Sequence, residues 1–543
     1  MRTPLIAAAA LLLATVSTAA LADTLVHNAK GIQVDAQGRI ERFTGLVIGN
    51  DGKVVRLVRA NEKPSARITK RIDAGGRTLL PGLIDAHGHV MGLGFGALQL
   101  DLTGTSSLAD LQQRLKAYAA ANPQAKWIVG RGWNQETWAD KRFPTAADLD
   151  EVVGDRPVWL GRVDGHAGVV NKAALKAAGI TAATKSPAGG RIENGLFVDA
   201  AMALVEDRIP DPTVAEMDAA LAKAQELMLA NGLTAAADMG VSAGDWAAMN
   251  RAGRAGTLNV RILGYAGGIP AMRAINKGRP SGWLFGDRLR LGGVKLYADG
   301  ALGSRGAWLK APYHDQPTRG LSLIDDAELA KQAGEAHAAG HQLAIHAIGD
   351  AANAQVISAF ERLGRGAKGD RRWRLEHAQV LDVADLPRLA KANIIASMQP
   401  THQTSDRTMA EARLGPKRLG GAYAWQTLAK SGVRLAFGSD FPVESPNPFP
   451  GLAAAVSRQD MNGQPAGGWR PHERVSFATA LGGFTRGAAF AGFAEGRIGS
   501  LDAGKHADFI LVDRDVSSVA PGELGRTQVL ETWVAGKKVW AKK

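Results

Sequence analysis

The middle of the chain alternates short apolar runs with longer, Ala-rich stretches of helical character. In one repeat of this order, residues 221–229 predict a helix, Gly232 marks its end, and residues 233–238 predict a strand. Further strands are predicted to end at or near polar residues, at 294–296, 343–346, 373–377, 394–398 and 434–440. Alternating strands and helices predict an α/β fold with a parallel sheet. Polar residues at the carboxyl ends of these strands favour a TIM-like (β/α)8 barrel over an open sheet.

The two ends of the chain show a different pattern of short apolar strands and tight turns. Residues 47–55 place an Asp-Gly pair between two apolar runs, which is a typical hairpin signal. Near the C-terminus, residues 509–512 and 529–534 predict strands, and a turn at Gly536 precedes a last one. Two β-rich ends around an α/β middle predict a small β-sandwich that both ends of the chain build together.

These patterns predict the domain organisation. The sandwich is expected to take residues 23–80 and 491–543, and the barrel residues 81–490. The segment within about 101–290 is long for its share of a barrel. It therefore predicts an insertion that helps to cover the site.

The first 22 residues predict a cleavable signal peptide. Arg2 gives a positive start, residues 5–16 form an apolar run, and Ala20-Leu21-Ala22 fits a small-x-small cleavage site before Asp23. The apolar run is shorter than the ~20 residues that a membrane span needs. We therefore expect a secreted, periplasmic protein without a stable membrane span.

Composition narrows the chemistry that the chain can use. The 543 residues include no cysteine, so the fold relies on its core and any metal site must use His or carboxylate ligands. The formal net charge is +13, but the basic residues are scattered and no nucleic-acid-binding motif is present. We expect a small-molecule partner and no nucleic acid, and the sequence leaves open whether chains associate into a homo-oligomer.

The most informative motif is His87-Gly88-His89 at the end of a predicted buried strand. Side chains two residues apart on a strand point the same way, so both imidazoles are expected to face one point. Imidazole is the commonest protein metal ligand near neutral pH. A lone His-x-His occurs by chance on polar loops, but here matching polar residues follow at later strand ends. The motif therefore predicts a divalent metal site.

Four later residues extend this set: Lys295, His346, His377 and Asp440 each lie in or at the end of an apolar run. Each has an ordinary explanation by itself, such as a hydrogen-bonded structural histidine or a helix N-cap aspartate. Their order after the His-x-His motif favours a shared function.

Together these motifs resemble the amidohydrolase superfamily of metal-dependent hydrolases, and in detail its amidohydrolase family 3, which includes N-substituted formamide deformylase. The segments that carry the resemblance are residues 81–89, 294–307, 345–350, 375–379, 438–442 and 504–510. They correspond to the family's opening strand, its lysine-bearing strand and glycine-rich loop, its later strand ends and its closing sandwich strand. The resemblance covers nearly the whole predicted mature chain.

The resemblance implies a divalent metal site, with zinc as the expected ion, at the mouth of a barrel. It implies that His87, His89 and Asp440 bind one metal and that His346 and His377 bind a second. Lys295 would bridge the two as an N-carboxylated lysine; the alternative is one metal, with Lys295 structural or in contact with substrate. Zinc lowers the pKa of a bound water to about 7, and Asp440 is the expected proton acceptor.

Five other residues are weaker candidates for contact with substrate: His166, Arg305, Trp133, Glu136 and Gln399. Arg305 suits a substrate carboxylate or a salt bridge within the fold. Trp133, with Trp138 beyond Glu136, suits a pocket wall or the core. Gln399, with His402, follows a predicted strand at the mouth.

The predicted reaction is the hydrolysis of a non-peptide C–N bond, in an amide or an N-acyl or N-formyl compound. A deaminase or cyclic amidohydrolase on the same fold is an alternative, although His346 is followed by Ala-Ile-Gly-Asp and lacks the nearby Glu typical of such deaminases. A non-catalytic periplasmic metal- or ligand-binding protein is the alternative from another class. Such a binding protein needs no general base, yet Asp440 is present where one is expected.

Overall fold

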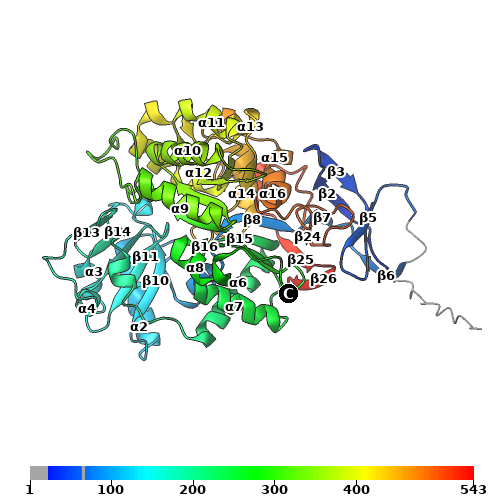
Figure 1. Cartoon of the computed structure of the whole chain (residues 1–543). Helices are drawn as coiled ribbons and strands as arrows, with labels where there is room; N and C mark the ends of the chain where they lie inside the picture. Colours follow the sequence, from blue (N-terminus) through cyan, green and yellow to red (C-terminus); the bar gives the residue numbers. More distant parts are fainter. Residues whose placement is uncertain (1–22, 64–67) are drawn as a thin grey trace, which may run out of the picture.

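The computed structural model describes residues 23–63 and 68–543, so the predicted signal peptide lies outside the described residues. An eight-stranded parallel sheet forms the centre of the molecule (Figure 1), and its strands neighbour one another in chain order. The strands are β8 (Leu83–Gly88), β15 (Leu233–Val241), β16 (Arg261–Gly267), β17 (Leu289–Tyr297), β18 (Gln342–Ala347), β19 (Arg374–His377), β21 (Ile395–Met398) and β23 (Leu435–Phe437). The predicted (β/α)8 barrel is confirmed.

The first and last strands meet and bring their polar ends together. The backbone N–H of Asp440, just beyond β23, donates a hydrogen bond of 2.7 Å to the carbonyl oxygen of His87 on β8. The strands are apolar on both faces because helices cover the outside and side chains fill the inside. Small interior residues such as Ala86, Ala344 and Ala436 are completely buried. The closure of the barrel between its first and last strands thus places two predicted ligands, His87 and Asp440, side by side.

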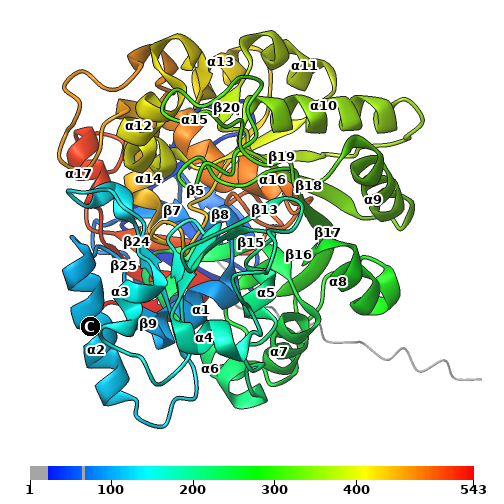
Figure 2. The same ribbon diagram turned by 90° about the vertical axis from the view of Figure 1, so that its left-hand side faces the viewer.

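Helices surround the barrel strands (Figure 2). They are α1 (Val90–Leu98), α6 (Val214–Ala230), α7 (Ala243–Arg254), α8 (Gly268–Ala274), α9 (Asp326–Ala338), α10 (Asp350–Gly364), α11 (Leu386–Lys391), α12 (Pro400–Leu414), α13 (Trp425–Lys430), α14 (Pro448–Ser457), α15 (Phe477–Gly482) and α16 (Ala488–Ala491). Thr213 and Glu216 cap the start of α6 reciprocally, as do Ser242 and Asp245 for α7. Among the residues that the structure describes, no helix has the length and apolar character needed to cross a bilayer.

A second sheet lies between α1 and α6 in the sequence, on the side of the barrel away from the first described strands of the chain (Figure 1). Its strands are β9 (Leu100–Asp101), β10 (Ile128–Trp133), β11 (Val158–Arg162), β12 (Ala167–Val170), β13 (Gly190–Glu193) and β14 (Leu196–Asp199), with helices α2 (Leu108–Ala121), α3 (Ala146–Asp150), α4 (Lys172–Ala177) and α5 (Ala203–Glu206). β9, β10 and β11 are mutually parallel, so their carboxyl ends lie along one edge. We call this unit the inserted sheet.

Two sheets at the ends of the chain form the sandwich. One has the order β5-β4-β1-β6 and the other β26-β25-β24-β7-β2-β3. Their bounds are β1 (Asp23–His27), β2 (Lys30–Val34), β3 (Ile40–Phe43), β4 (Gly45–Ile48), β5 (Val54–Val58), β6 (Ile68–Asp73), β7 (Thr78–Pro81), β24 (Phe509–Val512), β25 (Val529–Val534) and β26 (Lys537–Ala541), with α17 (Pro521–Gly525) between β24 and β25. Leu80 of β7 pairs with Ile510 of β24, so the two ends of the chain share one sheet.

A buried ion pair joins the sandwich to the barrel. The guanidinium of Arg261 on β16 donates to both carboxylate oxygens of Asp508, at 2.6 and 2.9 Å. Asp508 directly precedes β24, and its Oδ1 also accepts from the backbone N–H of Ala535 at 2.7 Å. Both side chains are buried, so this contact fixes the sandwich against the amino-terminal end of a barrel strand.

Candidate active site

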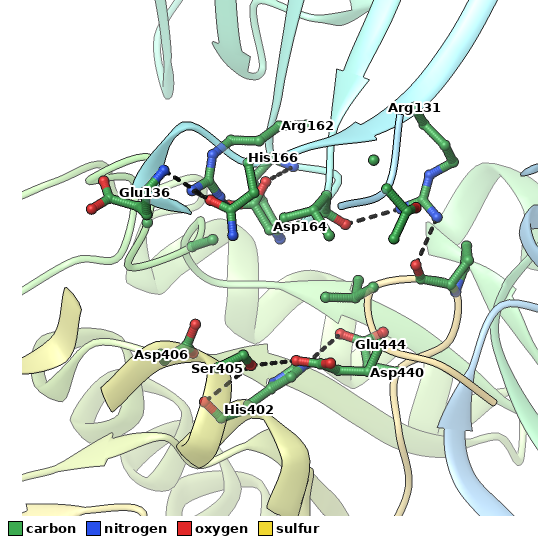
Figure 3. Close-up of a pocket in the computed structure, with 18 of the residues that line it drawn as sticks. Arg131, Glu136, Arg162, Asp164, His166, His402, Ser405, Asp406, Asp440 and Glu444 are labelled. Carbon is green, nitrogen blue, oxygen red and sulfur yellow. Dashed lines mark hydrogen bonds and ion pairs between the residues drawn. The ribbon is translucent and has the colours of Figure 1, made fainter. Parts of the chain in front are cut away.

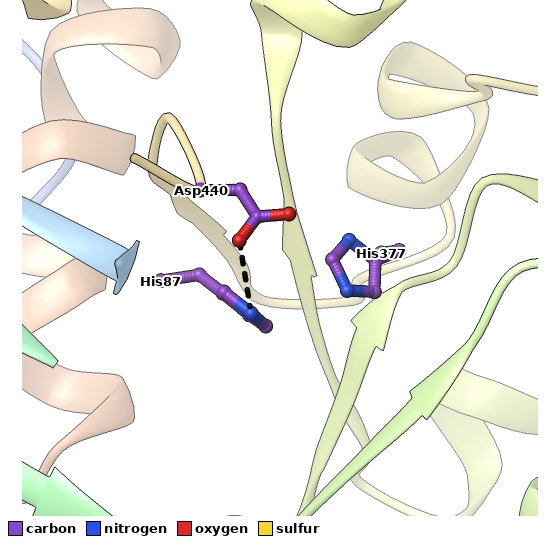
Figure 4. A group of neighbouring side chains, drawn as sticks. All are labelled: His87, His377 and Asp440. Atoms are coloured by element: carbon purple, nitrogen blue, oxygen red, sulfur yellow. Dashed lines mark ion pairs between the residues drawn. The ribbon is translucent and has the colours of Figure 1, made fainter. Parts of the chain in front are cut away.

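Three predicted ligands converge at the carboxyl ends of the barrel strands, where barrel enzymes hold their active sites. His87, His377 and Asp440 each offer one ligand atom, and these atoms all lie within 4.8 Å of one another (Figure 4). They come from β8, β19 and the segment after β23, which are far apart in sequence. The barrel thus assembles a compact cluster of two imidazoles and one carboxylate.

The other predicted ligands surround this cluster. His89 Nε2 lies 3.1 Å from Asp440 Oδ1, and His87 Nε2 lies 3.6 Å from the same oxygen. Lys295 Nζ lies 3.2 Å from His87 Nε2. The ring of His346 lies 4.5 Å from that of His377, centre to centre. The structure therefore brings all six predicted ligands to one place, with His87, His377 and Asp440 closest together.

Two of these residues have an unusual backbone conformation. His377 has φ 71° and Asp440 has φ 61°, in the left-handed region that non-glycine residues rarely adopt. Alternation along β19 would turn His377 to the same side as Leu375, which packs among the helix-facing apolar residues. The left-handed turn directs His377 to the cavity instead. Such backbone strain is typical of functional sites.

The protonation states suit a cation. Burial lowers the pKa of His87, His346 and His377 well below the usual value, so these imidazoles are neutral. Burial acts to raise the pKa of Asp440, but the adjacent His87 and His89 imidazoles hold it well below its usual range. Asp440 Oδ1 is buried and accepts no hydrogen bond from the described residues. Neutral imidazoles and an ionised carboxylate with an unused oxygen are the donor set that a divalent metal takes.

A buried pair behind the cluster orients His87. Glu376 Oε2 lies 2.6 Å from His87 Nδ1. Since a carboxylate only accepts, Nδ1 carries the hydrogen and Nε2 keeps its lone pair for a ligand. Arg374 in turn donates to Glu376 Oε1 at 2.7 Å, to Ser397 Oγ at 2.9 Å and to the carbonyl oxygen of Ala86 at 2.5 Å. This network fixes the tautomer and the direction of the imidazole.

A buried carboxylate also ties together the two strands that carry His87 and Asp440. Asp85 accepts from the backbone N–H of His87 at 3.0 Å, and from the backbone N–H and hydroxyl of Ser439 at 2.9 and 2.7 Å. Burial raises the pKa of Asp85 to about 7. Asp85 therefore holds the ligand-bearing ends of β8 and β23 in register.

Lys295 lies inside the barrel and faces the cluster. The side chain is 1% exposed and its ammonium lies 4.6 Å from the centre of the Tyr297 ring. Burial lowers the pKa of Lys295 to about 8, although the charges of Glu376 and Asp440 oppose this shift. The shift increases the neutral fraction of the amine near neutral pH, and the neutral form is the one that reacts with carbon dioxide.

Two adjoining cavities lie between the barrel mouth and the inserted sheet, with volumes of about 340 and 630 Å³. The smaller contains His87, His89, Lys295 and Tyr297, and both include His346, His377 and Asp440. Figure 3 shows two facing walls of the larger cavity. The carboxyl ends of β9, β10 and β11 form one wall, and α12 with the segment after Asp440 forms the other. The site thus lies between the carboxyl ends of β9, β10 and β11 on one side and the segments that follow the barrel strands on the other.

Two of the predicted substrate residues line these cavities. His166 lines both, and its Nδ1 lies 2.7 Å from Asp199 Oδ1. The glycine-rich loop makes room for this contact, because a Cβ at Gly300 would lie 2.3 Å from Asp199 Oδ2. Glu136 lines the larger cavity, where Arg413 forms an ion pair with it.

The structure places the other three predicted substrate residues outside the cavity lining. Trp133 is completely buried in the core of the inserted sheet and donates to the carbonyl oxygen of Leu160 at 2.8 Å. Arg305 forms an ion pair of 2.9 Å with Asp315. Of the two contacts predicted for Arg305, the structure therefore shows the salt bridge within the fold. Gln399 is buried behind His377, and its Oε1 accepts from His377 Nδ1 at 2.9 Å.

Sequence reasoning missed several residues of the site. Glu376 and Arg374 carry a signal, because two charged residues in a strand as short as Arg-Leu-Glu-His are unusual unless they are paired in the interior. Arg131 carries no such signal. It reaches from the inserted sheet to donate to the carbonyl oxygens of Pro442 and Val163, at 2.9 and 3.0 Å. Only the packing of the inserted sheet on the barrel brings it to the site.

A parallel barrel with this cluster at its mouth belongs to the class of barrel metallohydrolases, and comparison with known proteins agrees. The family model described as "Amidohydrolase family" matches residues 70–540. The chain therefore belongs to the amidohydrolase family, in its family 3 branch.

Individual relatives cover nearly the full length. A putative amidohydrolase, YtcJ of Bacillus subtilis (strain 168), is 33% identical over 91% of this chain and 94% of its own. N-substituted formamide deformylase of Arthrobacter pascens is 29% identical over 95% of this chain and 97% of its own. A crystal structure of an uncharacterized metal-dependent hydrolase from Pyrococcus horikoshii OT3 has a TM-score of 0.74 and 27% identity, and covers 92% of this chain and 99% of that one.

Proposed function

We propose that this amidohydrolase cleaves a non-peptide C–N bond of an amide, N-acyl or N-formyl compound. The observation that carries the proposal is the convergence of His87, His377 and Asp440 within 4.8 Å at the barrel mouth. The similarity to N-substituted formamide deformylase supports C–N bond hydrolysis as the reaction. The larger cavity, of about 630 Å³, has room for a small molecule of this kind.

The cluster fits one or two divalent cations, for which we propose zinc. His87, His89 and Asp440 would hold one cation, and His346 and His377 a second. Lys295 would bridge them after N-carboxylation, which its position 3.2 Å from His87 Nε2 and its lowered pKa support. A bound zinc ion supplies an ionised water near neutral pH and polarises the carbonyl group of the substrate.

The residues of this chain handle the proton and the substrate. The Asp440 carboxylate faces the cluster, and we assign its oxygen that would not bind the cation to accept the proton of the attacking water and to return it to the leaving nitrogen. His166, held by Asp199 on the inserted sheet, faces His346 at 5.0 Å between ring centres. Burial acts to lower the pKa of His166, but Asp199 raises it overall, and in the protonated form the ring can donate from Nε2 to a substrate oxygen. The inserted sheet forms one wall of the cavity between them.

The test is a screen of N-formyl and N-acyl amines with enzyme of measured zinc content. Hydrolysis should require the metal, stop with a chelator and return with zinc. Asp440→Asn should retain a metal content far above that of His87→Ala but lose at least ~10²-fold in kcat, the low end for a positioned proton acceptor. Turnover by metal-free enzyme, or near-normal turnover by metal-loaded Asp440→Asn, would refute the proposal. Release of ammonia from an aminopurine or aminopyrimidine instead would identify a deaminase.

A further inference from the structure

One wall of the larger cavity carries two carboxylates that the protein does not balance with a cation. Asp406 on α12 and Glu444 beyond Asp440 both line the cavity (Figure 3). Neither forms an ion pair with a lysine or arginine among the described residues. Of the three carboxylates of the inserted sheet that line the same cavity, Glu136 and Asp164 do so, with Arg413 and Arg162 respectively, whereas Asp101 is exposed to solvent.

Each of the two carboxylates keeps one oxygen unused. Asp406 Oδ2 accepts from Gln379 Nε2 at 3.1 Å and from the Tyr423 hydroxyl at 3.0 Å, and Glu444 Oε1 accepts from the Ser405 hydroxyl. No residue in the described part of the chain donates to Asp406 Oδ1 or Glu444 Oε2. Burial raises the pKa of both carboxyl groups, so the surrounding protein compensates their charge incompletely.

A third polar group faces the same space. His402, one turn before Asp406 on α12, is 7% exposed and lines the cavity. Its Nε2 is buried without a hydrogen-bond partner among the described residues and lies 3.9 Å from Asp440 Oδ2. A buried ring nitrogen without a partner costs free energy unless a ligand satisfies it. His402 is therefore an independent indication that a ligand group binds at this wall.

We propose that Asp406, Glu444 and His402 form a subsite for a protonated primary amine on the substrate. An ammonium group has three N–H donors, and this wall of the cavity carries acceptor atoms for it: the free carboxylate oxygens of Asp406 and Glu444 and, in the Nδ1–H tautomer, His402 Nε2. Hydrogen bonds between two charged groups are the strongest of their kind. His402 lies next to Asp440, so a short alkyl chain connects this subsite to the reacting carbonyl group. This inference rests on the proposed C–N hydrolysis, and it makes the substrate an N-acyl or N-formyl derivative of a diamine.

The kinetic test compares three N-formyl compounds of equal length: N-formyl-1,4-diaminobutane, N-formylpentylamine and N-formyl-5-aminopentanoate. The cationic compound should have at least a tenfold higher kcat/KM than the neutral one. Glu444→Gln and Asp406→Asn should each lose most of this preference, measured as the ratio of kcat/KM for the cationic compound to kcat/KM for the neutral one. Glu226→Gln, which removes an exposed carboxylate on α6, should keep the preference. Equal rates for the first two compounds, or a preference for the carboxylate compound through Arg131, would overturn the proposal.

A binding test separates this subsite from the proposed reaction. Calorimetry with zinc-loaded enzyme should show that butylamine binds at least tenfold more tightly than butanol, and that Glu444→Gln abolishes the difference. If no N-acyl or N-formyl compound is hydrolysed but this difference is found, the proposed reaction is wrong and the subsite stands. If hydrolysis is found but butylamine has no advantage that depends on Glu444, the subsite is wrong. Thermal unfolding of each variant shows whether it is folded.

Discussion

Replacing Glu376 with Gln tests whether the buried network behind His87 tunes the metal site. The glutamate uses two oxygens: Oε2 faces His87 Nδ1 at 2.6 Å, and Oε1 accepts from Arg374 Nε at 2.7 Å. Oε2 also accepts from Arg374 Nη2 at 3.2 Å. Glutamine keeps the shape but has one acceptor oxygen, so with that oxygen toward His87 the Nε–H of Arg374 faces an amide NH2 and loses its acceptor. All three side chains are completely buried, and the unsatisfied donor therefore costs about 1–3 kcal/mol.

The loss should appear in metal affinity as well as in stability. Where a partner of a ligating histidine is removed, metal affinity or activity falls by about 10- to 100-fold. Competition with a chromophoric chelator measures the zinc affinity, and thermal unfolding of the metal-free protein measures stability. The control is Glu361→Gln, which alters a glutamate paired with Arg388 at 2.6 Å on the partly exposed surface of α10. It should leave the zinc affinity unchanged. Zinc affinity of Glu376→Gln within threefold of the unmodified protein would refute the role of this network.

Three further predictions concern the fold, the second metal and export. Asp508→Asn should lower the stability by about 3–5 kcal/mol, because it leaves the Arg261 guanidinium buried without its counter-ion; unfolding in denaturant measures this. Burial acts to raise the pKa of Asp508, but Arg261 lowers this pKa overall. The ion pair should therefore contribute fully to the free energy of unfolding above about pH 4, and its contribution should be lost as the pH falls further. A stability difference between the unmodified protein and Asp508→Asn that grows in acid would contradict this reasoning. Lys295→Ala should reduce bound metal from two ions toward one, and one tight ion in both proteins would rule out a bridge. Mass spectrometry of protein from the native cell envelope should find Asp23 at the N-terminus, and an intact Met1 would contradict cleavage.

The pattern of apolar and polar residues along the chain was sufficient to predict the barrel and the strands that carry the predicted ligands. Parallel strands are apolar on both faces and end at the active-site rim, so apolar runs followed by His or Asp mark both the strand and the site. The sandwich was predictable from the hairpin signals at the two ends. The six ligand candidates lie together because each lies within, ends or follows such a strand.

What could not be predicted depends on contacts between distant segments. Arg131 reaches the mouth only because the inserted sheet packs over the barrel, and Arg305 has Asp315 as its partner through the fold of one loop. Trp133 lies near Glu136 in sequence but turns into the core, because strand neighbours point in opposite directions. The direction of His377 depends on a left-handed backbone that no residue pattern indicates.

The pairing of Leu80 with Ile510 has a consequence for the order in which the sandwich can be completed. β7 lies between β2 and β24, so one side of β7 stays open until almost the whole polypeptide has been synthesised. A chain that stops early, before β24, keeps a bare strand edge, and bare edges attract other chains or proteases. The sandwich therefore depends on a strand far along the chain to cover an edge that the first strands leave open.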